Sequence, residues 1–205
     1  MKYKNHIFVV IVSAVVLFVF QYSKAEEGDN DAVAVVETLH TALINTMQNA
    51  EALGYQGRYD ELAPVIQSDF DTPLIAKVVL SRYWKELDEQ QQANFIDLFN
   101  QLSISTYAAR FDNYSGETFK TLKVEQLKKG RLLVKTELIS ADSSSVRLDY
   151  LMQLNNGHWY IINVIADGVS DLSLKRAEYA AIISEKGFES LVQDIENKIK
   201  NHENS

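Results

Sequence analysis

The histidines are the side chains with the most obvious metal chemistry, and their spacing argues against a metal centre. The chain has four histidines and no cysteine. His40 falls in the first helical pattern and His158 beside a turn, while His6 and His202 lie near the chain ends. No two of them have the short spacing with which one element presents a pair of zinc ligands. The sequence therefore predicts neither a metal site nor a cofactor.

Nucleophiles and carboxylates do not form a catalytic set either. The sequence has no Gly-x-Ser-x-Gly turn and no glycine-rich phosphate loop. Asp149 and Asp167 are the candidates for acid–base chemistry. We interpret Asp149 as an outward-facing surface carboxylate and Asp167 as a turn residue beside Gly168, because ordinary carboxylates far outnumber those with tuned pKa values. We expect that the protein is not an enzyme.

Aromatic side chains are the positive signal. They gather on two consecutive helical patterns and on two later strand patterns. Aromatic stripes usually form ordinary core, so the pattern alone favours packing over a ligand cavity. The residues concerned are Tyr83, Trp84, Phe95, Phe99, Tyr107 and Phe111 on the helices, and Tyr150, Trp159 and Tyr160 on the strands.

The strands that carry these aromatics are predicted from a turn. Asn155-Asn156-Gly157 is flanked by alternating apolar residues, which is typical of a hairpin with a type I′ turn. The second strand, 159–165, is apolar on both sides, and we expect it to be covered on both. Two further strands, 117–127 and 131–140, precede this hairpin and complete a four-stranded antiparallel meander.

Helical spacing fills the rest of the chain. Asp71-Thr72-Pro73 and Asp88 with Gln91 are typical helix starts. Helices in runs followed by strands in runs indicate an α+β fold. Residues 26–30 and 200–205 are predicted to be frayed tails. The predicted helices cover 31–52, 59–69, a stretch from residue 72, 89–111, 171–184 and a stretch after Gly187.

The first 25 residues have the pattern of a signal peptide. Lys2 and Lys4 precede a 14-residue apolar stretch, 7–20, and Ser23 and Ala25 form a small-x-small cleavage site. A membrane span needs about 20 apolar residues, so cleavage is expected, with an uncleaved anchor as the alternative. We therefore expect export to the periplasm and a single domain over 26–205.

Net charge limits the partners. The formal charge is −8, and cleavage, which removes three lysines and no acid, would make it −11. An acidic domain is repelled by nucleic acid and by anionic membrane surfaces. We expect no nucleic-acid partner and a monomer that meets partners through local patches.

An ordered set of short motifs resembles the MlaC family of periplasmic lipid-binding auxiliary proteins of ABC transporters. The upstream motifs are most similar to the hopanoid-associated HpnM branch. Asn163 departs from the pattern, since the family often has Asp there. The motifs are Gly57-Arg58-Tyr59, Leu62-Ala63-Pro64, Phe70-Asp71-Thr72-Pro73, Trp84, 107–111, 114–117, Asp149-Tyr150, Gly157-His158-Trp159, Asp167-Gly168-Val169-Ser170 and Lys175-Arg176.

The resemblance implies an antiparallel sheet wrapped by helices around an apolar pocket that holds lipid acyl chains. It also implies a carrier of phospholipid or hopanoid that shuttles between an inner-membrane MCE-type ABC transporter complex and an outer-membrane partner. The residues expected to line the pocket are Phe70, Leu74, Val78, Trp84, Phe95, Phe99, Leu102, Tyr107, Tyr150, Met152, Trp159, Ile161 and Val169. Arg110, Lys175 and Arg176 are expected at the pocket mouth or at a partner-docking surface, with Gly168 as a hinge.

Two alternatives remain open at this point. The first is an enzyme with a small apolar pocket of the ketosteroid-isomerase type, for which Tyr150 and Asn163 are the one pair the sequence offers. The second is a periplasmic scaffold with a filled core and no lipid.

Overall fold

The computed structural model describes residues 29–204, so the predicted signal peptide lies outside the described residues. A first helix covers residues 29–48. The helices that follow are α2 (Ala50–Asp69), α3 (Thr72–Leu80), η1 (Ser81–Glu86), α4 (Glu89–Arg110), α5 (Asp171–Lys186) and α6 (Phe188–Glu203). Between α4 and α5 lie β1 (Thr118–Gln126), η2 (Lys128–Gly130), β2 (Arg131–Ile139), β3 (Ser145–Asn155), β4 (His158–Ala166) and β5 (Val169–Ser170).

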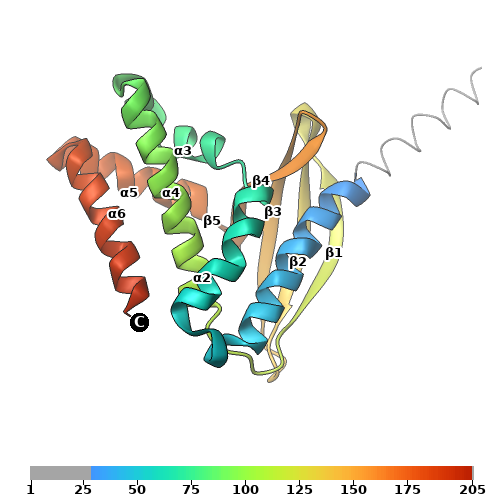
Figure 1. The fold of residues 1–205 in the computed structure, drawn as a ribbon. Helices are drawn as coiled ribbons and strands as arrows, with labels where there is room; N and C mark the ends of the chain where they lie inside the picture. The colour runs from blue at the N-terminus through green and yellow to red at the C-terminus, as the bar shows by residue number, and fades with distance from the viewer. Residues whose placement is uncertain (1–28, 205) are drawn as a thin grey trace, which may run out of the picture.

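The strands form one antiparallel sheet in the order β1-β2-β3-β4-β5. The predicted α+β class and the four-stranded meander are confirmed, and the two-residue β5 adds a fifth strand at the edge beside β4. Asn156 and Gly157 have φ angles of 50° and 82°, as the predicted type I′ turn requires. In Figure 1 the first helix and α2 lie in front of the sheet, and α4, α5 and α6 stand to one side of it.

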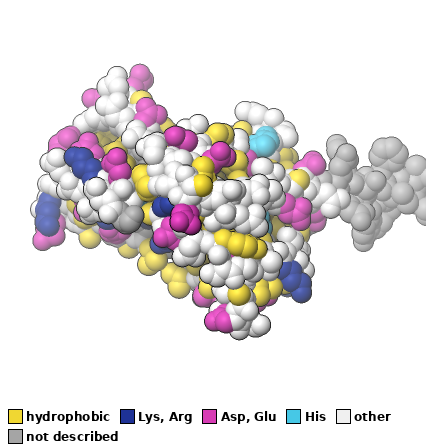
Figure 2. Space-filling view, turned by 60° about the horizontal axis from the view of Figure 1, so that its bottom comes forward, with side chains coloured by type: hydrophobic (Ala, Val, Ile, Leu, Met, Phe, Trp, Pro, Cys, Tyr) yellow, Lys and Arg dark blue, Asp and Glu magenta, His cyan; other side chains and the backbone are white. Residues whose placement is uncertain are grey.

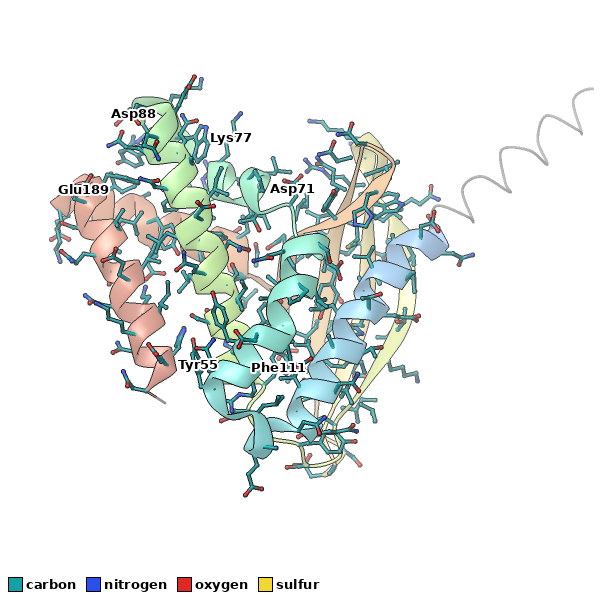
Figure 3. All side chains as sticks on the ribbon, in the orientation of Figure 1. Tyr55, Asp71, Lys77, Asp88, Phe111 and Glu189 are labelled. Carbon is teal, nitrogen blue, oxygen red and sulfur yellow. The ribbon has the colours of Figure 1, made fainter. Side chains whose placement is uncertain are left out.

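Two helix starts form as predicted, because each cap depends only on neighbours in the chain. The backbone N–H of Leu74 donates to Oδ1 of Asp71 at 3.1 Å. Asp88 and Gln91 form a reciprocal capping box, with bonds of 2.8 Å and 3.0 Å. Asp88 and Phe111 mark the two ends of α4 in Figure 3.

Asn49 alone separates the first helix from α2, and α2 is kinked near its start. Gly54 has φ 60° and ψ −173°, which breaks the helical backbone there. Arg58 follows the kink and is 7% exposed. Its Nε donates to the Ala108 carbonyl near the end of α4 at 2.8 Å, and its Nη1 donates to the Ala50 carbonyl at 3.4 Å. The guanidinium thus joins the start of α2 to the last turn of α4, where carbonyls lack helical donors.

The apolar side chains form two clusters. The sheet cluster joins the inner face of the sheet to the first helix, α2 and α4; the helical cluster joins α3, α4, α5 and α6. Helix α4 belongs to both, through Ile104 in the sheet cluster and Leu102 in the helical cluster. The buried members of the sheet cluster are Ala32, Val36, Leu39, Leu43, Leu62, Ile66, Ile104, Leu132, Val134, Tyr150, Met152, Trp159 and Ile161. Those of the helical cluster are Ala76, Val79, Leu80, Phe95, Phe99, Leu102, Tyr179, Leu191 and Ile195.

One sequence-based expectation is confirmed and one is wrong. At the centre of β4, Ile161 and Asn163 face opposite sides of the sheet and both are buried, as expected for a strand covered on both sides. The end of the chain is not frayed from residue 200, because α6 continues to Glu203 and Nδ1 of His202 lies 2.9 Å from Oγ of Ser105. Within residues 29–204, no helix has both the length and the apolar character needed to cross a bilayer.

Candidate functional site

The connection between α2 and α3 brings the two clusters together against β4. Phe70 forms a parallel bridge to Ile161, and the Asp71 N–H donates to the Ile161 carbonyl at 3.1 Å. Asp71 also caps α3, so this short segment fixes where α3 leaves the sheet (Figure 3). The predicted pocket residues lie on both sides of this junction.

Three aromatic rings line up beside the junction. The rings of Phe70 and Tyr107 meet edge to face with centroids 5.9 Å apart, and those of Tyr107 and Phe111 stack at 5.7 Å. All three side chains are partly exposed. Burial, followed by the negative charge of Asp171, raises the pKa of Tyr107, although Arg110 opposes this. Tyr107 is therefore an uncharged phenol whose hydroxyl is buried, although the residue as a whole is partly exposed.

Six of the predicted residues belong to the sheet cluster or pack against it. Tyr150 is 1% exposed, and its hydroxyl lies 3.1 Å from Nε2 of His40. Burial raises the pKa of Tyr150 well above its usual value. The six are Phe70, Tyr107, Tyr150, Met152, Trp159 and Ile161.

Four others lie in the helical cluster or pack against it, namely Trp84, Phe95, Phe99 and Leu102. Phe95 and Phe99 meet the ring of Tyr179 edge to face, at 6.3 Å and 6.4 Å. Sequence reasoning missed Tyr179. Its spacing from Leu172 and Ile183 on α5 is a helical stripe that could have identified it.

The remaining three belong to neither cluster. Leu74 and Val78 lie four residues apart on α3 and are half-buried. Val169 is 51% exposed on β5. These side chains are thus not used in packing either core.

A separate open groove of about 700 Å³ lies between the first helix and β1. None of the predicted pocket residues lines it. His40 is 5% exposed on its wall, and its ring stacks on Phe119 with centroids 3.9 Å apart. Burial lowers the pKa of His40 to about 4. The groove is lined by Glu37, His40, Thr41, Ile44, Asn45, Tyr114, Glu117, Thr118, Phe119, Lys120 and Thr121.

Comparison with known proteins identifies the family. The model of the MlaC protein family matches residues 37–197, which is most of the chain. The chain belongs to the MlaC family. Among solved structures, the fold is similar to that of a phospholipid-binding protein from Ralstonia solanacearum, determined in complex with a phospholipid. The TM-score is 0.74 at 20% identity, over 84% of this chain and 98% of that one.

In this MlaC protein the predicted basic residues do not form one cluster of contacts. Arg110 is exposed in the last turn of α4. Lys175 pairs with Asp171 at 3.0 Å, and Nη2 of Arg176 donates to Oγ of Ser81 at 3.0 Å. Gly168 lies in the tight turn between β4 and β5, with φ 83°.

The pair that an isomerase-type enzyme would need is not assembled in this MlaC protein. Asn163 pairs in register with Leu151, on the opposite sheet face from Tyr150. Its amide bonds Ser170 and accepts the Leu172 N–H at 3.1 Å, so it holds the start of α5. Among residues 29–204, no three His, Cys, Asp or Glu side chains are placed to share a metal ion.

Proposed function

We propose that this protein is a periplasmic lipid carrier that holds acyl chains between the sheet cluster and the helical cluster. Membership of the MlaC family carries the proposal. The likeness to a protein that was solved with a bound phospholipid supports a phospholipid as the ligand, with a hopanoid-type lipid as the alternative. The assignment to the hopanoid-associated branch remains a prediction.

The acyl chains would lie along the junction beneath α3. Leu74 and Val78 are half-buried but outside both cores, and Phe70 and Tyr107 pack against the sheet cluster but remain partly exposed. Such side chains can exchange water contacts for lipid contacts without opening a packed core. Residues already packed in the helical cluster, such as Phe95 and Phe99, would support this wall rather than touch lipid.

The free energy of burial explains why such a carrier needs docking partners. Burying one CH₂ is worth about 0.8 kcal/mol, so a 16-carbon chain gains on the order of 12 kcal/mol before costs. Release into water would be correspondingly slow. We therefore propose transfer while docked to membrane complexes, an inner-membrane MCE-type transporter and an outer-membrane partner. Arg110, one turn beyond Tyr107 on α4, would meet the lipid headgroup.

Native mass spectrometry of protein purified from its own periplasm tests the carrier function. We expect a discrete adduct whose ejected ligand is a phospholipid or a hopanoid. Val78→Trp fills the proposed space and should reduce the adduct at least tenfold with an unchanged circular dichroism spectrum. Leu174→Trp is the matched control, because Leu174 is exposed on α5.

The outcomes separate the candidate functions. A bare mass with no lipid uptake from vesicles would favour the scaffold alternative and overturn the carrier. A ligand that changes mass during incubation would indicate an enzyme. Equal loading in Val78→Trp and in the control would place the lipid elsewhere, with the groove beside β1 as the next candidate.

A further inference from the structure

The face of the sheet that points away from both clusters carries its own apolar surface. Strand residues alternate between faces, so the neighbours of inward-facing Val134 and Tyr150 point outward. We call this surface the outer face. The register places Leu133 beside Leu151, and Lys135 beside Asp149 and Ile165. Its apolar members are Leu133, Leu151, Tyr160 and Ile165.

The outer face is not part of the hydrophobic core. None of its apolar members belongs to the sheet cluster or the helical cluster. Leu133, Leu151, Tyr160 and Ile165 remain partly exposed. Contiguous half-exposed apolar side chains on an open sheet are typical of an interaction surface.

Asp149 lies within this apolar surface and forms no ion pair with any of residues 29–204. The residue is 8% exposed, and its Oδ1 accepts no hydrogen bond from any of residues 29–204. Lys135, its cross-strand neighbour, instead approaches Glu125 with Nζ and Oε2 2.9 Å apart. Arg147, two residues away on the same strand, is exposed and forms no ion pair with Asp149 in the described structure. A buried carboxylate oxygen that accepts no hydrogen bond is costly, which makes it unusual in a purely structural role.

We propose that the outer face is a docking surface for another protein, and that Asp149 receives an Arg or Lys side chain which that protein presents from an apolar surface. The proposal rests on charge complementarity: an unpaired carboxylate selects a cation, and the chain as a whole carries a net charge of −8. On the view in Figure 2, acidic side chains outnumber basic ones, which would steer a basic partner toward the protein. The surrounding apolar residues would exclude water from the pair.

Two other occupants fit the outer face less well. A second copy of this chain is equally acidic, so long-range repulsion opposes self-association. An anionic membrane surface would be repelled by Asp149 for the same reason. The proposal does not rest on lipid carriage, because the outer face lies on the opposite side of the sheet from the proposed acyl chains.

Site-specific photocrosslinking in living cells tests the proposal. A benzophenone amino acid replaces Tyr160 on the outer face, and in a control protein it replaces exposed Tyr114 before β1. Each is combined with Asp149→Asn or with the matched Asp112→Asn, which removes the same charge from an exposed position. Crosslinked peptides are sequenced, and thermal midpoints and bound-lipid masses are measured on the same variants.

We expect a protein adduct at position 160 but not the same adduct at 114, with an Arg or Lys among apolar residues in the captured peptide. Asp149→Asn should reduce this adduct about tenfold or more, whereas Asp112→Asn should not. The thermal midpoint of Asp149→Asn should stay equal or rise, since a functional residue is kept at a cost in stability. Its lipid mass should not change.

Four results would overturn the proposal. They are the absence of a protein adduct at 160, an adduct with lipid or with a second copy of this chain, an adduct that Asp149→Asn leaves unchanged, and a lower thermal midpoint for Asp149→Asn. The last would show that the carboxylate stabilises the isolated fold. A loss of lipid in Val78→Trp would leave the adduct at 160 intact, so failure of the docking surface and failure of the carrier function can be told apart.

Discussion

His40 shows how burial of one residue creates a pH dependence. Its imidazole stacks on Phe119, bonds the Tyr150 hydroxyl at 3.1 Å, and is almost fully buried. Desolvation disfavours the imidazolium, so the pKa falls from 6.5 to about 4. The folded protein therefore binds a proton at His40 less readily than the unfolded chain does.

Replacement of His40 should remove part of the acid sensitivity. Between pH 6.5 and about pH 4 the unfolded state binds the proton and the folded state does not, so wild-type stability should fall by about 3 kcal/mol across that window as pH decreases. His40→Gln can keep a bond to Tyr150 but cannot titrate. Urea unfolding at pH 7 and pH 4.5 measures the difference. Equal losses of stability in the wild type and in His40→Gln between pH 7 and pH 4.5 would contradict the assignment of this acid sensitivity to His40.

Arg58 stabilises the fold through the ends of two helices. Its guanidinium donates to carbonyls of Ala108 and Ala50, and it is 7% exposed. Arg58→Met should lower the free energy of unfolding by about 2–3 kcal/mol, because hydrogen bonds to a charged group are lost and buried carbonyls are left unpaired. Arg58→Lys keeps the charge but loses the planar set of guanidinium donors. Its free energy of unfolding should therefore lie between those of the wild type and Arg58→Met. A loss below about 0.5 kcal/mol for Met in urea unfolding would show that water satisfies these carbonyls.

At the scale of elements, the β4–β5 turn depends on backbone conformation rather than on contacts. Gly168 has φ 83°, and a Cβ added there would have no heavy atom within 4 Å. Gly168→Ala should therefore destabilise the protein by about 1 kcal/mol through backbone strain alone. Proline at this position would break the turn, because its φ is held near −65°, so it would not test a hinge.

Thermal unfolding of Gly168→Ala checks this expectation, and Ala180→Gly on α5 is a comparison that alters a helix instead of the turn. An unchanged midpoint for Gly168→Ala would mean that the turn relaxes without cost. Asn163 and Ser170 stay bonded in either case, since they connect β4 to the start of α5 independently of the turn.

At the scale of the whole molecule, α4 connects two separate cores. Leu102 belongs to the helical cluster and Ile104 to the sheet cluster, on one continuous helix. The chain has two tryptophans, Trp84 packed against the helical cluster and Trp159 in the sheet cluster. Each core therefore has its own fluorescent reporter.

We expect the two cores to unfold together. Trp84→Phe and Trp159→Phe each leave one reporter. In each variant, the denaturant midpoint from the fluorescence of the remaining tryptophan should equal the midpoint from circular dichroism of the same variant. The physical reason is that melting either core removes the support of α4 from the other. A fluorescence midpoint above the circular dichroism midpoint in one variant and below it in the other would show two independent units.

Much of the fold followed from short-range pattern. The Asn155-Asn156-Gly157 turn and the Asp88–Gln91 capping box depend on residues within a few positions of each other, so the sequence was sufficient to predict them. The predicted pocket residues were found from periodicity, which places a side chain on a face but cannot say what the face meets. For that reason the same pattern predicted both Phe95 and Val78 to line the pocket, although Phe95 is packed in the helical cluster and Val78 is half-exposed.

The sequence by itself determined the α+β class, the order of the elements, most helix ends and, through ordered motifs, the family. Only the tertiary structure decided that Arg58 joins two helix ends, that His202 reaches Ser105, and that Asp149 is outward-facing yet buried. Each of these depends on partners 20 or more residues away, or on which face of the sheet the helices cover. Local periodicity contains no information about such distances, because burial is a property of the assembled surfaces and not of the segment that carries the residue.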